Sequence, residues 1–292
     1  MKILVLKAGR QPYDTDFIDY FNKYGQETGN TYIIGYLDDV IFDFRDPITI
    51  TIDGVNILDY DFIYFRTWEK RPDIASTLAK HLIKHSKKFA DSAVGLSNYG
   101  SKIHQHYLLI TNGLNLPATF IIHKRLLDEN LESHIQKLGG YPAVLKATRG
   151  NEGKGVYLLN SFDDYVKIKE ELKDEYYFIQ ELIPNDFDYR FVVFGEKVAV
   201  VKKRVRNKDS AEFRNNVSLG AEVEYLKPED FPEISEIAVK AAKVKNLQVA
   251  GVDVVVSNKN SKIYLFEVNP APAFRHDFTV LKYLDEYFKS IS

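Results

Sequence analysis

Two apolar runs near the end of the chain decide the fold: GVDVVV at residues 251–256 and IYLFEVNP at residues 263–270. The polar segment 258–261 between them predicts a hairpin turn. Folding back about this turn brings Asp253 near Glu267 and Asn269. Because Glu267 and Asn269 are two residues apart, both leave an extended strand by the same face, and Val268 points into the core. The hairpin therefore gathers oxygen ligands.

An all-oxygen cluster of this kind suits a magnesium–nucleotide site. Mg²⁺ is usually held by one or two carboxylates together with phosphate oxygens. The alternative is that Asp253 and Glu267 are ordinary solvent-facing residues of an antiparallel hairpin. A glycine-rich loop and two lysines upstream favour the metal site.

Composition and charge set the class of protein. The 292 residues are 45% hydrophobic and 27% charged, which predicts a globular chain with two or three packed subdomains. The net charge of −2 gives no overall field for nucleic acid or membrane. The absence of cysteine excludes disulfides, thiolate zinc sites and cysteine nucleophiles. No apolar run reaches a membrane-spanning length, so a cytoplasmic protein is expected, and a homo-oligomer stays open.

The first part of the chain alternates strand and helix patterns, which predicts a small α/β domain over residues 1–97. The expected strands are 3–6, 32–36, 48–52, 55–58 and 62–65, and the expected helices are 14–24 and 74–83. The Asp53-Gly54 dipeptide predicts a tight hairpin. No Gly-x-Gly-x-x-Gly follows the first strand, so a dinucleotide site is not expected here.

Arg66 follows directly after a predicted strand. Open α/β sheets place ligand contacts at such strand ends. Arg66 therefore either holds a substrate carboxylate or belongs to a solvated charged loop.

The loop GNEGKG at residues 150–155 lies between two apolar strands within 141–159. Glycines let backbone N–H groups approach phosphate closely, and such a loop can close like a lid, although a plain hairpin loop is the alternative. The order of residues is not that of a Walker A loop. Lys146, at the end of the preceding strand, is expected to be half-buried, which calls for an anion nearby.

A helix is expected over 101–112, with Lys102 at its start and Ile103, Tyr107 and Ile110 on one face. His104 and His106 lack metal-ligand spacing and are expected at the surface or in packing. The remaining predicted helices are 126–138, 162–172, 229–244 and 280–288, and the remaining strands are 117–122, 177–183, 191–194 and 198–201. The basic run Lys202, Lys203, Arg204 and Arg206 either lines a solvated edge or faces phosphate or a developing anion.

Seven motifs in this order resemble the ATP-grasp superfamily, and specifically ligases similar to the ribosomal protein S6 glutamate ligase. The motifs are Lys102, LK at 145–146 with GNEGKGV at 150–156, QELI at 180–183, DYR at 188–190, FRNN at 213–216, AGVD at 250–253 and EVNP at 267–270. The resemblance implies an α/β (α+β) ATP-grasp fold behind an N-terminal Rossmann-like domain. The implied division is 1–97, a small subdomain 98–178 with the phosphate loop, and a C-terminal subdomain 179–292 with the metal hairpin.

The resemblance also implies a role for each matching residue. The residues expected to bind ATP are Lys102, Lys146, Gly153, Lys154, Gly155, Gln180, Glu181, Ile183, Asp188, Arg214 and Asn216. Within this set the lysines contact phosphates, residues 180–183 meet adenine and Asp188 takes the ribose. Asp253, Glu267 and Asn269 hold two Mg²⁺ ions, which Mn²⁺ can replace, and Arg204 and Lys146 are the expected catalytic residues.

The implied reaction joins a carboxylate to an amine or hydroxyl group of an amino acid, peptide or small acid. The carboxylate attacks the γ-phosphate of ATP to give an acylphosphate and ADP, and the acceptor then displaces phosphate. Residues 269–275, NPAPAFR, depart from the glutamate-ligase pattern of small residues and a glycine. This segment, which includes Arg275, and the region of Arg66 resemble ligases that cross-link side chains of ribosomal peptides. A peptide cross-linker, an ATP-grasp kinase and a non-catalytic nucleotide-binding module are the alternatives.

Overall fold

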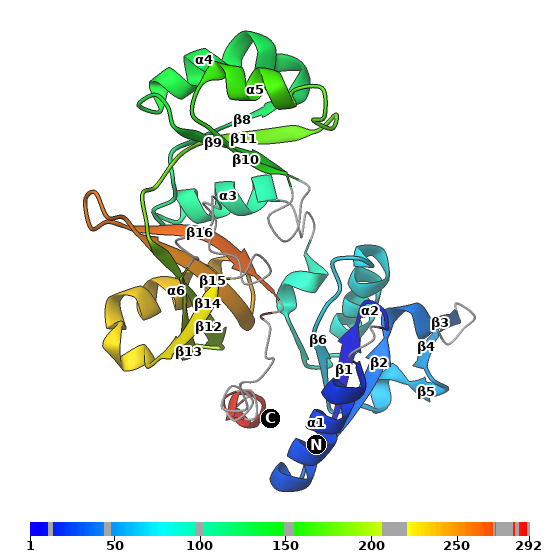
Figure 1. Cartoon of the computed structure of the whole chain (residues 1–292). Helices are drawn as coiled ribbons and strands as arrows, with labels where there is room; N and C mark the ends of the chain where they lie inside the picture. Colours follow the sequence, from blue (N-terminus) through cyan, green and yellow to red (C-terminus); the bar gives the residue numbers. More distant parts are fainter. Residues whose placement is uncertain are drawn as a thin grey trace.

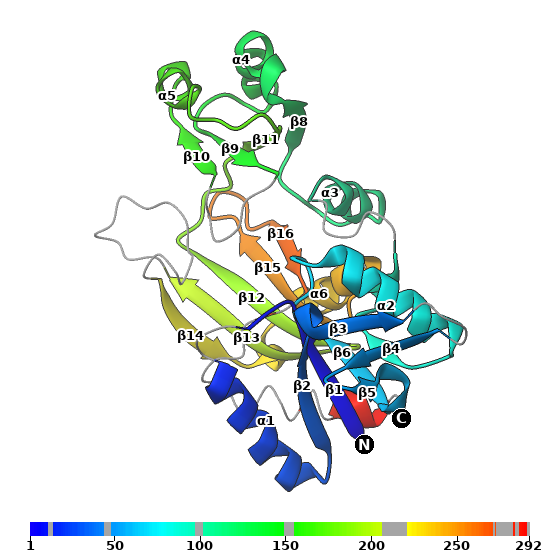
Figure 2. The same cartoon turned by 90° about the vertical axis from the view of Figure 1, so that its right-hand side faces the viewer.

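The computed structural model describes residues 1–10, 14–43, 48–96, 102–148, 155–205, 221–270, 272, 283 and 286–290. The described strands form four sheets, arranged as an N-terminal α/β unit, a small sheet and a large central sheet (Figures 1 and 2). This mixed α/β architecture confirms the predicted fold class. Within these residues, every helix is too short or too polar to cross a membrane.

The N-terminal unit is built on a parallel sheet in the order β2-β1-β6-β7. Its elements are β1 (Lys2–Lys7), α1 (Asp14–Thr28), β2 (Thr31–Tyr36), β6 (Phe62–Phe65), α2 (Pro72–Lys84) and β7 (Phe89–Ala90). A smaller antiparallel sheet contains β3 (Val40–Asp43), β4 (Thr49–Ile52) and β5 (Val55–Asn56). Asp53 and Gly54 both have positive φ at its predicted turn, 49° and 77°. The α/β alternation is confirmed, and the Rossmann-like assignment stays a prediction.

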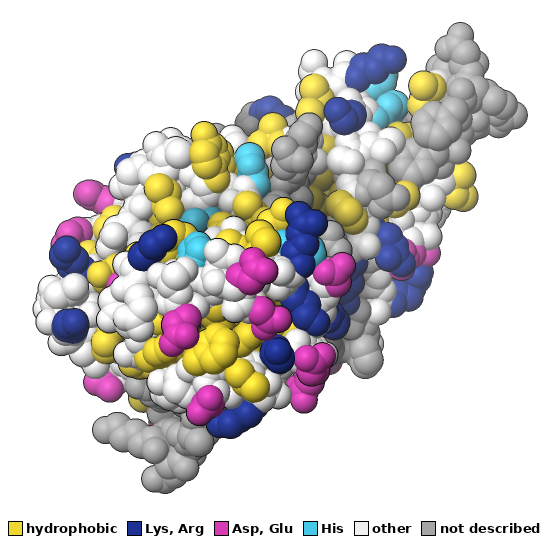
Figure 3. Space-filling view, turned by 90° about the horizontal axis from the view of Figure 1, so that it is seen from above, with side chains coloured by type: hydrophobic (Ala, Val, Ile, Leu, Met, Phe, Trp, Pro, Cys, Tyr) yellow, Lys and Arg dark blue, Asp and Glu magenta, His cyan; other side chains and the backbone are white. Residues whose placement is uncertain are grey.

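The small sheet is antiparallel, in the order β10-β9-β11-β8. Its elements are β8 (Thr119–His123), α4 (Leu127–Lys137), β9 (Ala143–Ala147), β10 (Val156–Leu159), α5 (Phe162–Ile168) and β11 (Tyr176–Glu181). Side chains such as Leu131, Leu145 and Tyr165 form one core between the sheet and its two helices. Strand β11 runs across the predicted boundary at residue 178, and the domain division stays a prediction. Basic and acidic side chains are interspersed on the face seen from above (Figure 3).

The large sheet is antiparallel, in the order β14-β13-β12-β15-β16. Its elements are β12 (Phe187–Phe194), β13 (Lys197–Val205), β14 (Glu222–Leu226), α6 (Pro232–Val244), β15 (Val249–Val256) and β16 (Ile263–Asn269). A hairpin at Gly195 joins β12 to β13, which contain the strands predicted over 191–194 and 198–201, and the predicted hairpin of β15 and β16 forms as expected. Helix α6 packs on one face through Ile234, Ala238 and Ala241.

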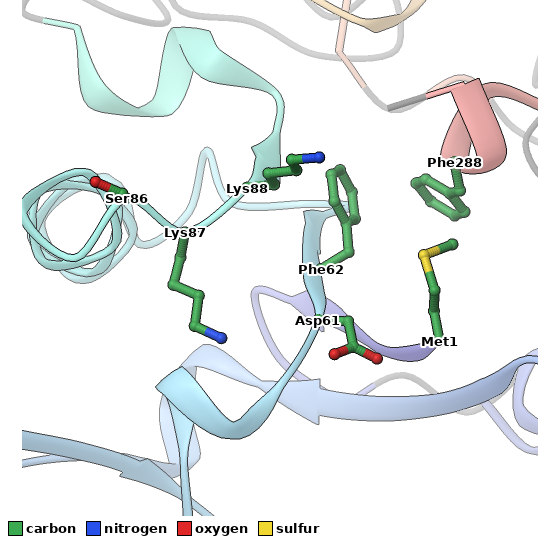
Figure 4. Close-up of a pocket in the computed structure, with 7 residues that line it drawn as sticks. All are labelled: Met1, Asp61, Phe62, Ser86, Lys87, Lys88 and Phe288. Carbon is green, nitrogen blue, oxygen red and sulfur yellow. The ribbon is translucent and has the colours of Figure 1, made fainter. Parts of the chain in front are cut away.

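The other face of the large sheet divides into an apolar half and a polar half. Val192 and Phe194 belong to a core shared with Ile3 and Phe62 of the N-terminal unit. Phe288 closes this core, with its ring centroid 4.9 Å from that of Phe62. Figure 4 shows both rings grouped with Met1 beside a surface hollow. Because side chains alternate along a strand, every second residue of β12 projects from this face. The residues that come before Val192 on this face lie outside the apolar core and can form a polar site.

Helix α3 (Lys102–Thr111) forms where the sequence predicts it, but the predicted apolar face is wrong. Tyr107 and Ile110 are 65% and 49% exposed, whereas Leu109 is buried in the core beneath α6. Gln105 is buried on the same side and accepts a hydrogen bond from the Val268 N–H, 3.0 Å away. This contact with β16 orients the helix. The spacing of apolar residues in the sequence does not reveal it.

Asp91 joins the N-terminal unit to the start of β15. Its Oδ1 accepts hydrogen bonds from the N–H groups of Gln248 and Val249, at 2.6 and 2.8 Å. Burial raises the pKa of Asp91 from 3.8 to about 7, against the lowering effect of these two hydrogen bonds. The carboxyl group therefore titrates near neutrality while it holds the strand that leads to Asp253.

Stability should consequently depend on pH through Asp91. A carboxyl group whose pKa is raised by folding stabilises the protein fully below its unfolded pKa, and this contribution is lost as the pH rises through the folded pKa. The window runs from pH 4 to pH 7. The Asp91→Asn variant keeps an acceptor for both N–H groups but cannot ionise. We expect wild type to lose up to about 4 kcal/mol relative to the variant across this window. Urea unfolding at several pH values measures the difference, and parallel pH profiles would contradict the expectation.

Candidate active site

The hairpin of β15 and β16 brings the three predicted metal ligands together. Asp253 pairs with Glu267 across the two strands, and Gly251 pairs with Asn269. The Asn269 Nδ2 lies 3.3 Å from the Glu267 Oε2, so both side chains leave β16 by the same face. Val268 between them is 3% exposed, in the core, as predicted.

The donor chemistry of this cluster fits a magnesium ion. Burial alone would raise the pKa of Glu267, but the positive charges of Lys146 and Lys102 outweigh it and lower that pKa. Burial likewise acts to raise the pKa of Asp253, and neighbouring Arg190 and Arg204 lower it. Both carboxylates are therefore ionised, as metal ligands must be. In the described part of the chain, no three His, Asp or Glu side chains form a group that could hold a metal ion, and the third donor in the prediction is the amide of Asn269.

A chain of buried ion pairs extends from Asp253 across the large sheet. Arg190 donates from Nε and Nη2 to both carboxylate oxygens of Asp253, at 2.6 and 2.7 Å. The Arg204 Nη2 lies 3.2 Å from the Asp253 Oδ1, and its Nε donates to the Asp188 Oδ1 at 2.5 Å. Burial raises the pKa of Asp188 to about 6, against the lowering effect of Arg204. The two arginines thus hold two carboxylates in place on one face of the sheet.

Gly251 makes room for this arrangement. A Cβ atom at this position would lie 3.4 Å from the Arg190 Cδ and 3.2 Å from the Pro272 Cβ. A side chain at position 251 would therefore crowd Pro272 and Arg190, the arginine that pairs with Asp253. This explains the glycine at the third position of β15.

Beside Glu267, the small sheet and α3 line a pocket together with the end of β16. The residues that line it are Lys102, Gln105, His106, Leu109, Leu116, Lys146, Phe178, Gln180, Phe266 and Glu267. The Lys102 Nζ lies 3.6 Å from the Glu267 Oε1. Burial lowers the pKa of Lys102, and Glu267 opposes the shift. The structure thus brings both predicted phosphate-binding lysines close to Glu267, one of the predicted metal ligands.

The predicted adenine residues lie at the end of β11. Gln180 lines the pocket and donates from Nε2 to the Thr119 Oγ1 at 2.9 Å. Glu181 is tied to Ala118 by its own N–H and by its carboxylate, at 3.0 and 2.7 Å. Ile183 is buried against β15 and β16. Asp188, predicted at the ribose, pairs with Arg204 further along β12.

Four predicted ATP contacts lie outside the described residues: Gly153, Lys154, Arg214 and Asn216. Arg206 and Arg275 lie outside them as well. Gly155, the last glycine of the loop, is described and has a φ of 74°. A Cβ atom there would lie 2.9 Å from that of Ala147, so both the turn and the close approach of the strands require glycine.

Three residues of the site were missed. Arg190 belongs to the DYR motif at residues 188–190. Its pairing with Asp253, which is 63 residues further along the chain, depends on the register between β12 and β15. Gln105 lies one helical turn after Lys102, which is a signal that spacing on the helix could have given. His106 was expected at the surface or in packing, and its ring lies 5.5 Å from that of Phe178. It also lines the pocket, and burial together with Lys146 lowers its pKa.

Arg66 connects the N-terminal unit to the segment that follows the metal strand. The side chain is buried, and its Nη2 donates to the Pro272 carbonyl oxygen at 2.6 Å. Arg66 therefore does not lie in a solvated loop. A substrate contact for it stays a prediction.

Comparison with known proteins places this geometry in a family. Residues 100–281 match the model of the RimK-like ATP-grasp domain. A probable alpha-L-glutamate ligase of Legionella pneumophila (strain Corby) is 32% identical over 223 residues, which cover 75% of this chain and 71% of the relative. The chain belongs to the RimK-like ATP-grasp family and is an ATP-grasp ligase.

Solved structures agree with this fold over almost the whole chain. The ATP-grasp ligase PsnB, complexed with a phosphomimetic variant of its minimal precursor, Mg and ADP, has a TM-score of 0.74 at 17% identity, over 99% of this chain and 98% of that one. A RiPP-associated ATP-grasp ligase of Chryseobacterium gregarium, in complex with ADP and a leader and core peptide, has a TM-score of 0.73 at 16% identity, over 100% and 97%. At these sequence identities, the structural similarity shows a shared fold and nothing further.

Proposed function

We propose that this enzyme is an ATP-dependent carboxylate–amine ligase that forms an amide or ester bond through an acylphosphate and releases ADP and phosphate. Its acid substrate is an amino acid, a peptide or a small acid, and its acceptor carries an amine or a hydroxyl group. The observation that carries the proposal is the convergence of Lys102 and Lys146 on Glu267, with the pair of Asp253 and Arg204 directly beyond. The activity requires ATP and magnesium, which the cytoplasm supplies.

Each group of residues in the site has a separate role. Lys102 and Lys146 neutralise the phosphates of ATP and, with the loop that ends at Gly155, hold them above the metal strand. Asp253, Glu267 and Asn269 are the residues that would hold Mg²⁺, two ions in our proposal, and bound Mg²⁺ offsets the charge of the phosphate oxygens. Arg204, fixed by Asp188, presents its guanidinium to the charge that develops on the reacting carboxylate.

The proposed reaction needs no covalent intermediate on the enzyme. A carboxylate oxygen of the acid bonds to the γ-phosphorus while the bond to ADP breaks. The acceptor nitrogen or oxygen then attacks the carbonyl carbon, and phosphate leaves with the former carboxylate oxygen. The acceptor loses one proton. Positioning and charge neutralisation suffice for both steps, and the chain has no cysteine to serve as a nucleophile.

The test is to incubate the enzyme with ATP, Mg²⁺ and a panel of amino acids and short peptides, and to identify the nucleotide product. We expect ADP and phosphate, released only when both acid and acceptor are present. AMP and pyrophosphate would contradict an acylphosphate. A stable gain of phosphate on the acid, seen by mass spectrometry, would favour a kinase.

A second candidate is the formation of cross-links between side chains of a ribosomal peptide. It is suggested by the shared fold with PsnB, a ligase complexed with its minimal precursor, along nearly the whole chain. The contact from Arg66 to the Pro272 carbonyl oxygen also joins that unit to the segment that follows β16. A loss of one water mass within a single peptide, without an added amino acid, would distinguish this activity from amino-acid ligation.

A further inference from the structure

Strand β16 is an edge strand of the large sheet, so in the described part of the chain no further strand pairs with its outer side. Helix α3 and the segment that follows it lie along this side (Figure 1). The Leu265 N–H donates to the Asn115 carbonyl oxygen at 2.8 Å, and the Val268 N–H donates to the Gln105 Oε1 at 3.0 Å. The strand that carries Glu267 is therefore held at one point by backbone and at another by the side chain of Gln105.

A β-bulge lies between these two points. The pairing of β16 with β15 skips one residue, Phe266. Leu265 and Val268 both lie in the core beneath α6, although they are three residues apart. Because residues two apart share a face of a regular strand, Glu267 would otherwise follow Leu265 into this core. The bulge therefore turns Glu267 toward the site, and the bond to Gln105 fixes the strand directly after the bulge.

This bond also sets the orientation of the Gln105 amide. A backbone N–H can only donate, so the side-chain atom that faces Val268 is the oxygen, and the NH₂ group forms the other branch of the amide. Gln105 is 9% exposed and lines the same pocket as Lys102, Lys146 and Glu267. Because the oxygen is bonded to the strand, the NH₂ group is what Gln105 can offer to a ligand in this pocket.

The charges around this pocket favour an oxyanion. Lys102 and Lys146 each carry a positive charge, and Glu267 carries the negative charge among the residues that line the pocket. Burial and Lys146 together lower the pKa of His106, which is therefore uncharged at neutral pH. The lining residues thus leave one positive charge in excess. An ionised phosphate oxygen only accepts hydrogen bonds, so it suits both the lysines and an amide NH₂ group.

We propose that Gln105 has two functions in the active site: its oxygen positions the bulged metal strand, and its NH₂ group donates a hydrogen bond to a phosphate oxygen of the bound nucleotide. This inference rests on the proposed function, because it takes ATP as the ligand. Lys102 lies three residues earlier, on the same face of α3, and its Nζ is 3.6 Å from the Glu267 Oε1. Helix α3 thus contacts successive residues of the metal strand and offers two donors to the phosphates.

Two substitutions separate the functions of the oxygen and of the NH₂ group. Gln105→Glu keeps an oxygen that accepts the Val268 N–H but replaces the NH₂ group with a negatively charged oxygen. Gln105→Met removes both groups and keeps the length of the side chain. Gln136→Glu makes the same change of charge at an exposed position of α4 and is the matched control.

The experiment measures hydrogen exchange of the Val268 N–H by NMR on the full chain. We expect exchange about tenfold faster in Gln105→Met and unchanged in Gln105→Glu. Calorimetry with Mg²⁺ then compares a non-hydrolysable ATP analogue with adenosine, which lacks phosphates. We expect Gln105→Met to bind the analogue about tenfold more weakly and Gln105→Glu about a hundredfold more weakly, because its carboxylate repels phosphate. Adenosine affinity should stay unchanged in Gln105→Glu, and the control should match wild type throughout.

Exchange at the wild-type rate in Gln105→Met would overturn the positioning function. Unchanged affinity of Gln105→Glu for the ATP analogue would overturn the contact to phosphate. An equal loss for adenosine would do the same, because the NH₂ group would then serve Glu267 rather than the nucleotide. If wild type does not bind the analogue, the proposed function itself fails; if wild type binds it and both variants behave as wild type, only the role of Gln105 fails.

Discussion

The Glu267→Gln variant is expected to fold normally and to lose turnover by about a thousandfold, because a charge that offsets Mg²⁺ between phosphates contributes on the order of 4 kcal/mol to the transition state. The substitution keeps the shape of the side chain and an oxygen that can accept the Asn269 hydrogen bond. It removes the negative charge that lies 3.6 Å from the Lys102 ammonium. Initial rates of ADP release at saturating Mg²⁺ measure the effect.

Glu224→Gln is the matched control, because this carboxylate pairs with Lys203 at the exposed edge strand β14. It should retain wild-type rates. Near-normal turnover of Glu267→Gln at saturating Mg²⁺ would remove Glu267 from the ligands. A large drop in melting temperature would instead mean that its ion pair with Lys102 mainly serves the fold.

The second large effect is expected for Lys146→Met. Methionine keeps the apolar stem but deletes the charge, so folding should survive while ATP affinity falls. A charge-assisted contact to phosphate contributes on the order of 1.5 to 3 kcal/mol, which corresponds to roughly ten- to hundredfold weaker binding. Lys146 lines the pocket above Glu267 and lowers the pKa of that carboxylate. Titration with a fluorescent ATP analogue and a melting curve on the same sample measure both quantities.

An alternative for Lys146 is a purely structural pair with Glu181. The carboxylate of Glu181 accepts the Ala118 N–H at 2.7 Å, which ties it to the start of β8. Lys137→Met, at the end of α4 on the same subdomain, is the control and should bind ATP normally. Unchanged ATP affinity of Lys146→Met combined with a lower melting temperature would support the structural role.

The metal hairpin could be predicted because its evidence is local. The extended run from 263 to 269 places side chains two residues apart, such as Glu267 and Asn269, on one face, and the polar turn sets which ends of the two strands meet. The pairing of Asp253 with Glu267 follows from these two features and was found as predicted. The half-burial of Lys146 near the end of the buried strand β9 could be predicted in the same way and is found.

The surroundings of Asp253 could not be predicted, because they depend on pairings between distant strands. The register that sets Arg190 opposite Asp253 joins β12 to β15 across α6 and the whole of β13 and β14. Helix α3 shows the same limit. Its exposed Tyr107 and its buried Gln105 reverse what hydrophobicity predicts, because contact with β16 decides which face is inward.

The transfer of oxygen from the acid to phosphate tests the acylphosphate most directly. Labelled L-glutamate and a peptide ending in labelled glutamate, each with ¹⁸O in the carboxylates, are supplied with ATP, Mg²⁺ and unlabelled amines, and the released phosphate is analysed by mass spectrometry. We predict one ¹⁸O atom in each phosphate released during product formation. Product formed together with unlabelled phosphate would contradict the proposed reaction.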